Sequence, residues 1–117
     1  MRPEATVAPL SRDALLARVG GDAALVAAMA SLFLDECPRL LADVRDAVAA
    51  QDAAALAQAA HSLKGAVSNF IAPAASQAAA QLELLGLSGD LAASAVALRT
   101  LEAELDRLVP ALREMIA

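Results

Sequence analysis

Apolar residues recur along most of the chain at intervals of three and four positions, which is the spacing of one face of an α-helix. No segment shows a convincing alternation of apolar and polar residues, so the pattern predicts no strand. The periodic segments predict five helices, over about residues 12–19, 22–50, 53–71, 73–85 and 91–115. The sequence therefore predicts an all-α fold.

Residues that favour helix ends lie at the boundaries of these segments. Side chains that can accept a hydrogen bond from the first free N–H groups of a helix stand at Ser11, Asp22, Asp52 and Asp90. Gly20-Gly21 is expected to end the first helix, Pro73 suits the first turn of the fourth, and residues 86–89 form the next break. Pro38 predicts a kink in the second helix, and Pro110 a bend near the end of the last.

The links between the last four predicted helices are short, at residues 50–52, 72–73 and 86–90. Short links place consecutive helices antiparallel to one another. We therefore expect an antiparallel up-down four-helix bundle with a short extra N-terminal helix. Residues 1–10 are expected to form a flexible leader, and residues 11–117 a single helical bundle domain.

Two long apolar rows are expected to supply much of the core. The second helix carries Leu25, Met29, Leu32, Phe33, Cys37, Leu40, Leu41, Val44 and Val48. The last helix carries Leu91, Ser94, Leu98, Leu101, Leu105, Leu108, Leu112 and Met115, in the repeat of threes and fours that is typical of bundle packing. Because Cys37 lies within the first row, we interpret it as a core residue rather than a chemical group.

Composition and charge exclude several classes of function. The 117-residue chain has a net charge of -5, and it lacks the basic cluster that nucleic acids or anionic membranes would require. Its start lacks the apolar run of a signal peptide, and its longest charge-free run, residues 65–82, contains too many polar residues for a transmembrane helix. The single cysteine excludes an internal disulfide and fits a reducing compartment. We expect a monomer in the cytoplasm.

The chain lacks the residues for autonomous catalysis of the common kinds. One histidine and one cysteine cannot form a usual zinc site. No glycine-rich loop of the Walker or Rossmann type is present, so the protein should not phosphorylate itself from ATP. We expect neither a metal nor a cofactor of its own.

One short stretch of the third helix places unusual residues together. His61 is the only histidine of the chain and Lys64 its only lysine. A step of about 100° per residue puts His61, Gly65, Ser68 and Ala72 close to one line along the helix, with Lys64 about 60° to the side. We call this line of four residues the His61 stripe. The opposite face carries Leu63, Val67 and Phe70. These apolar residues suit the core, so His61 should point away from it.

Gly65 is the residue of the stripe that is hardest to explain as an accident. A glycine inside a helix costs about 1 kcal/mol relative to alanine, and this chain uses alanine freely. A glycine there suggests that another surface approaches the helix backbone closely. The alternative is a lone exposed histidine on an alanine-rich helix with a tolerated glycine.

The sequence around the stripe forms a recognisable pattern. It reads Ala60-His61-Ser62-Leu63-Lys64-Gly65 and is followed by Asn69, Ala72 and Leu82-Glu83. This pattern resembles the histidine-containing phosphotransfer (HPt) domain of bacterial two-component phosphorelays, and the resemblance extends from about Leu15 to Leu112. One departure is Ile71, where the family usually has glycine.

The resemblance implies a role for each residue of the pattern. His61 would accept a phosphoryl group at Nε2, Lys64 would offset the negative charge, and Gly65 would allow a partner to approach closely. Glu83, on the neighbouring helix, would accept a hydrogen bond from Nδ1–H and orient the imidazole, unless it is an ordinary surface glutamate. The implied partners are response-regulator receiver domains and a hybrid sensor histidine kinase, with Mg²⁺ supplied by the receiver.

Three hypotheses about function follow. The first is a phosphotransfer protein that relays phosphoryl groups between receiver aspartates and His61, and is a phosphocarrier rather than an enzyme. The second is a noncatalytic helical adaptor whose apolar rows bind a partner helix. The third is an enzyme with His61 as a general base. The adaptor would keep its binding after His61 is changed, and the enzyme would turn over a small substrate without a receiver.

Overall fold

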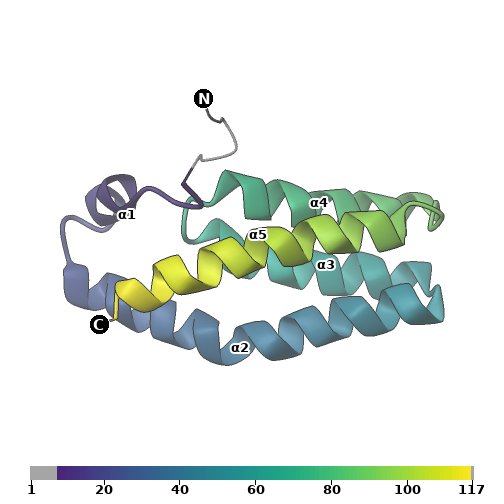
Figure 1. Ribbon diagram of the computed structural model, residues 1–117, viewed down its shortest axis with the longest axis horizontal. Helices are drawn as coiled ribbons and strands as arrows, with labels where there is room; N and C mark the ends of the chain where they lie inside the picture. The colour runs from purple at the N-terminus through teal and green to yellow at the C-terminus, as the bar shows by residue number, and fades with distance from the viewer. Residues whose placement is uncertain (1–7, 117) are drawn as a thin grey trace.

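The computed structural model describes residues 8–116 and contains five helices in that range and no strand. The helices are α1 (Arg12–Arg18), α2 (Ala23–Ala50), α3 (Ala53–Ser68), α4 (Pro73–Ser88) and α5 (Ser94–Glu114). The chain turns back after each of α2, α3 and α4 (Figure 1). The predicted all-α fold is confirmed.

Three of the predicted helix starts are confirmed by their side-chain caps. Ser11 Oγ accepts a hydrogen bond from the Ala14 backbone N–H at 3.1 Å. Asp22 and Asp52 accept in the same way from the third residue beyond them, each at 3.0 Å. These polar side chains satisfy backbone donors that have no partner inside the helix, so the helices begin where the sequence predicts.

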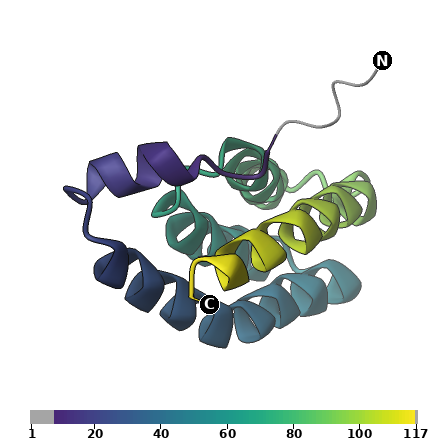
Figure 2. The same cartoon turned by 60° about the vertical axis from the view of Figure 1, so that its left-hand side comes forward.

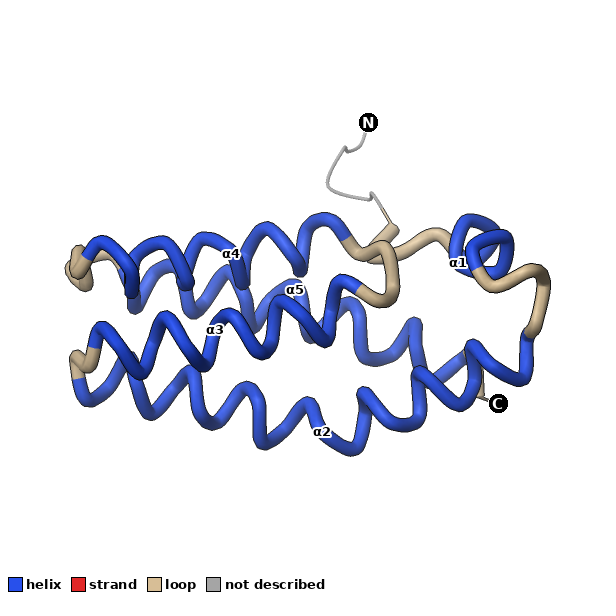
Figure 3. The backbone as a smooth tube through the Cα atoms, turned by 180° about the vertical axis from the view of Figure 1, so that it is seen from behind, coloured by secondary structure: helices blue, strands red, loops and turns tan. Residues whose placement is uncertain are grey.

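The four long helices form a closed ring of neighbours. Helix α2 packs against α3 and α5, and α4 packs against the other sides of α3 and α5. Seen from behind, α3 and α4 run side by side and are joined by a short loop at one end (Figure 3). This arrangement is the predicted antiparallel up-down bundle, which buries one stripe of each helix.

The short helix α1 lies beside one end of the bundle, near the start of α2 and the end of α5 (Figure 2). Leu15 is its buried residue and is fully inaccessible to solvent. Leu10, at the end of the segment predicted as a flexible leader, is also buried in the core. Residues 1–7 of that leader, and residue 117, lie outside the described residues.

The core row predicted for α2 is partly wrong. Leu25 and Leu32 are 45% and 61% exposed. The buried positions of α2 are Val26, Ala30, Phe33, Cys37, Leu40, Val44, Ala47 and Val48. The first part of the buried face therefore lies one residue further along α2 than predicted, with Val26 and Ala30 in place of Leu25 and Met29. Cys37 is buried as predicted, and burial raises the pKa of its thiol.

The row predicted for α5 agrees better with the structure. Its buried residues are Ser94, Leu101, Leu105, Leu108 and Leu112. The remaining members, Leu91, Leu98 and Met115, are partly buried against the same core. Helix α5 continues through Pro110, and α2 continues through Pro38 and bends part-way along its length (Figure 1).

Three predicted helix ends differ from the structure. Helix α3 ends at Ser68 rather than Ile71, because Ile71 adopts a left-handed backbone with φ of 52° that cannot continue a right-handed helix. Helix α4 extends to Ser88, and Gly89 ends it with φ of 78°. Asp90 caps no helix, since α5 begins only at Ser94 after a turn.

Among residues 8–116, no single helix has both the length and the apolar character needed to cross a membrane. Helices α1 and α2 are long and apolar enough only when they are counted as one segment, and they are bent by 109° relative to each other.

Candidate functional site

Helix α3 presents His61 on the face that points away from the bundle. Its buried residues include Leu63 and Val67, both fully inaccessible, and Phe70 beyond its end is 2% exposed. The His61 side chain is 68% exposed. The helical period therefore separates an apolar face from a solvent-facing imidazole, as predicted.

The imidazole of His61 contacts the neighbouring helix α4 through one nitrogen. Nδ1 lies 2.8 Å from Oε2 of Glu83. Because a carboxylate only accepts hydrogen bonds, Nδ1 carries the proton in this contact. In the neutral ring, the other nitrogen, Nε2, then has a free lone pair, and the side chain is open to solvent.

Lys64 binds the second oxygen of the same carboxylate. Its Nζ lies 2.6 Å from Oε1 of Glu83, and the Glu83 side chain is only 15% exposed. The hydrogen bond from Lys64 lowers the pKa of the Glu83 carboxyl, and the contact with His61 lowers it further, while burial acts in the opposite direction. Glu83 is therefore a carboxylate at neutral pH and joins the two distinctive side chains of α3 in one cluster.

The stripe beyond His61 is open at Gly65. A Cβ atom placed on Gly65 would meet no heavy atom within 4 Å. Ser68 is exposed, and its hydroxyl donates to the Gly65 carbonyl at 2.8 Å. The prediction that Ala72 belongs to the stripe is wrong, because α3 ends before it and Ala72 is buried. The His61 stripe thus consists of three exposed residues rather than four.

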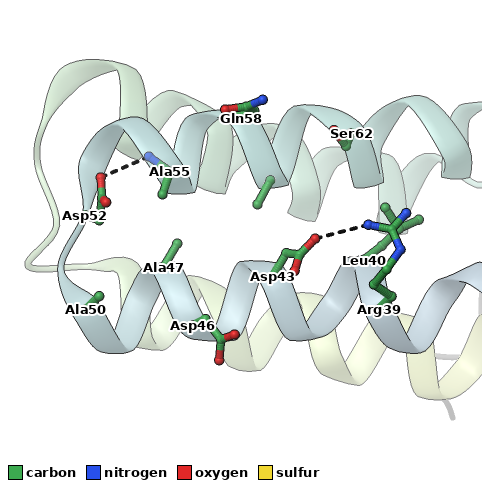
Figure 4. Close-up of a pocket in the computed structure, with 11 residues that line it drawn as sticks. Arg39, Leu40, Asp43, Asp46, Ala47, Ala50, Asp52, Ala55, Gln58 and Ser62 are labelled. Atoms are coloured by element: carbon green, nitrogen blue, oxygen red, sulfur yellow. Dashed lines mark hydrogen bonds and ion pairs between the residues drawn. The ribbon is translucent and has the colours of Figure 1, made fainter.

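Two grooves lie on the side of α3 that faces α2, and neither includes His61. The larger, of about 570 Å³, is lined by Ser62 and Gln58 of α3 and by acidic residues of α2 (Figure 4). An exposed ion pair of 3.3 Å between Arg39 and Asp43 lies at its edge. The smaller, of about 160 Å³, is lined by Met29, Leu32, Phe33, Glu36, Ala66, Asn69 and Phe70.

Three of the four residues predicted for the site touch one another, and the fourth does not. His61, Lys64 and Glu83 are in direct contact, while Gly65 lies one turn further along α3 with open space above it. In residues 8–116, no group of three or more His, Cys, Asp or Glu side chains is placed to hold a metal ion. The sequence suggested only the contact between His61 and Glu83, and the Lys64 contact was missed because it depends on the register of two helices.

One comparison with known proteins identifies a family for this chain. A family model described as the Hpt domain matches residues 28–111, which include every residue of the cluster. Neither the curated proteins nor the solved structures gave a match. Because the family model covers well over half of the chain, the protein belongs to the Hpt domain family.

Proposed function

We propose that this protein relays a phosphoryl group between the aspartates of receiver domains and His61. Hpt domains act as phosphocarriers in phosphorelays rather than as kinases. The observation that supports the proposal most directly is the exposed imidazole whose Nδ1 is held by Glu83 at 2.8 Å. This contact leaves Nε2 as the nucleophile, in the tautomer that the reaction requires.

In the proposed transfer, the lone pair of Nε2 attacks the phosphorus of an aspartyl phosphate on the receiver. The nitrogen–phosphorus bond forms as the bond from phosphorus to the aspartate oxygen breaks, and the aspartate leaves as a carboxylate. The imidazole then carries a positive charge with its proton still on Nδ1. The nearby carboxylate of Glu83 stabilises this charge, and the reverse steps return the phosphoryl group to a second receiver.

Lys64 has the capacity to serve both Glu83 and the phosphoryl group. An ammonium group has three N–H donors, and the contact with Glu83 Oε1 at 2.6 Å uses one of them. The side chain is still 36% exposed, beside His61 on the same helix. We propose that the remaining donors offset the negative charge of the phosphorylated imidazole.

Gly65 would let the receiver come close to the helix backbone beside His61. The open space at its Cβ position supports this role, since a side chain there would project into the approach path rather than into the bundle. The proposed partners are receiver domains and a hybrid sensor histidine kinase, and Mg²⁺ would be supplied by the receiver. The protein itself would act as a monomer without a cofactor.

The test is incubation with a phosphorylated receiver domain in the presence of Mg²⁺, followed by a search for phosphohistidine. The parental protein should gain an acid-labile, alkali-stable phosphoryl group, and His61→Gln should gain none. His61 is exposed, so the substitution should change the free energy of unfolding by no more than about 0.5 kcal/mol. Equal labelling of parent and variant would reject the proposal. Receiver binding without any labelling would instead support the adaptor hypothesis.

A further inference from the structure

The second glycine inside a helix, Gly86 of α4, has surroundings opposite to those of Gly65. It is buried, and a Cβ atom placed on it would lie 2.5 Å from the Ala57 backbone nitrogen. The same atom would lie 2.8 Å from the Ala53 carbonyl oxygen and 2.8 Å from the Ala57 Cα. All three neighbours are backbone atoms of α3, so no side chain can turn away to make room.

This backbone contact lies next to the cluster of His61 and Glu83. Gly86 follows Glu83 by three residues on α4, and Ala57 precedes His61 by four on the antiparallel α3. At 1.5 Å per residue, the contact is therefore about 5 Å along the helices from the hydrogen bond. The distance between the two helices at Gly86 is consequently close to the distance that Glu83 must bridge.

We propose that Gly86 is a positioning residue for phosphotransfer, which sets the spacing of α3 and α4 at which Glu83 holds Nδ1 of His61. This inference rests on the proposed function for its effect on the reaction. Gly86 touches neither His61 nor a substrate, and acts only through the placement of Glu83.

The size of the effect follows from the contact distances. Ordinary contacts of a Cβ atom begin at 3.4 Å, so the contact of 2.5 Å would have to open by roughly 0.9 Å. If the full shift reaches Glu83, the bond from Nδ1 would lengthen from 2.8 Å to roughly 3.7 Å, outside the hydrogen-bond range. The imidazole has two side-chain torsions with which to follow Glu83, whereas Lys64 has four. Gly86→Ala should therefore lose the His61 contact and keep the Lys64 contact.

The first experiment measures the tautomer of the His61 imidazole in the unphosphorylated protein. The ¹⁵N chemical shifts of the two ring nitrogens are compared between the parent and Gly86→Ala, at a pH where the ring is neutral. The parent should show Nδ1 protonated and Nε2 unprotonated, and the variant should show a mixture of both tautomers. A single tautomer retained in the variant, or a mixture already present in the parent, would overturn the proposal.

A matched control separates this effect from a general loss of stability. Val67→Ala leaves a cavity in the core of α3 without inserting an atom between α3 and α4. It should keep the parental tautomer and transfer rate at a temperature well below its melting point. If Gly86→Ala melts too low to study, trimethylamine oxide is added to favour the folded state. A variant that stays unfolded even then would overturn the proposal, because Gly86 would be required for the whole bundle.

The second experiment asks whether Gly86 acts through Glu83. Gly86→Ala should slow transfer from a phosphorylated receiver by about tenfold. This is the lower end of the range known for metal-bound histidines that lose an outer hydrogen bond, which we take as the nearest analogy. In a Glu83→Ala background, the same substitution should have little further effect. An equal loss in both backgrounds would refute the role. If the parent accepts no phosphoryl group at all, the proposed function fails, while the tautomer comparison still decides the placement of Glu83.

Discussion

Ile71 is the position at which the backbone and the side chain disagree most clearly. Its φ of 52° lies in the left-handed region, where a branched side chain is strained, and the residue is only partly buried. Such a conformation costs about 1–3 kcal/mol for a residue other than glycine. Ile71 lies in the short link in which the chain reverses between Ser68 and Pro73 to begin α4.

The prediction compares two substitutions that both remove the isoleucine side chain. Ile71→Gly should be more stable than Ile71→Ala by about 1 kcal/mol, since the penalty of about 1–2 kcal/mol for a left-handed residue disappears and is offset in part by the entropy of glycine. The difference in melting temperature should be about 4 °C for a domain of this size. Ile71→Asn should fall between the two, because asparagine tolerates this backbone better than alanine does.

Thermal and urea unfolding, followed by circular dichroism at 222 nm, measure these differences. Ala66→Gly, inside α3, is the matched control, and there glycine should be the less stable residue by about 1 kcal/mol. The reversal of sign between the two positions isolates the effect of the backbone conformation. An Ile71→Ala protein as stable as Ile71→Gly, or more so, would show that Ile71 is not held in a left-handed conformation.

Three further predictions concern the candidate site on α3 and α4. Lys64→Ala should slow phosphotransfer or shorten the lifetime of phosphohistidine, more at low salt than at high salt, and equal kinetics at both ionic strengths would contradict it. Gly65→Leu should raise the melting temperature, since leucine is the better helix former, and it should also slow phosphotransfer; Gly65→Ala should slow it less. A Gly65→Leu protein that transfers at the parental rate would remove the argument that a receiver docks there. The folded-state pKa of Glu83 lies below its usual 4.5, so the ionised carboxylate stabilises the fold above that pH, and this effect is lost as the pH falls through the lowered value. Glu83→Gln should therefore lose less stability in acid than the parent, and equal acid sensitivity of the two proteins would refute this.

Local signals in the sequence predicted most of the fold correctly. The caps at Ser11, Asp22 and Asp52 were found because a cap needs only one side chain and the N–H groups next to it in sequence. The exposure of His61 was predicted correctly because helical periodicity is also a local property. The end of α3 was missed because an isoleucine at residue 71 gives no sign of a positive φ, whereas glycine, the usual residue of the family there, would have predicted it.

The site was less predictable where it depends on distances between helices. The pattern placed Glu83 near His61 only through a resemblance, and it did not place Lys64 on the same carboxylate. It also assigned Gly86 to a break between helices, whereas Gly86 lies inside α4 against the α3 backbone. A glycine in a loop and a glycine in a tight helix contact look alike in a sequence, because both are explained by the lack of a Cβ atom.

The abundance of alanine in this chain has a direct consequence for the proposed chemistry. At the contact between α3 and α4, Ala53 and Ala57 face Gly86, and small residues at such a contact let two helix backbones approach closely. At a wider spacing, the carboxylate of Glu83 would not reach Nδ1 of His61 at 2.8 Å. Larger apolar residues would bury more surface at this contact, but they would hold the helices too far apart for the hydrogen bond. The small residues that let α3 and α4 approach closely therefore also bring the carboxylate of Glu83 within reach of the exposed imidazole of His61.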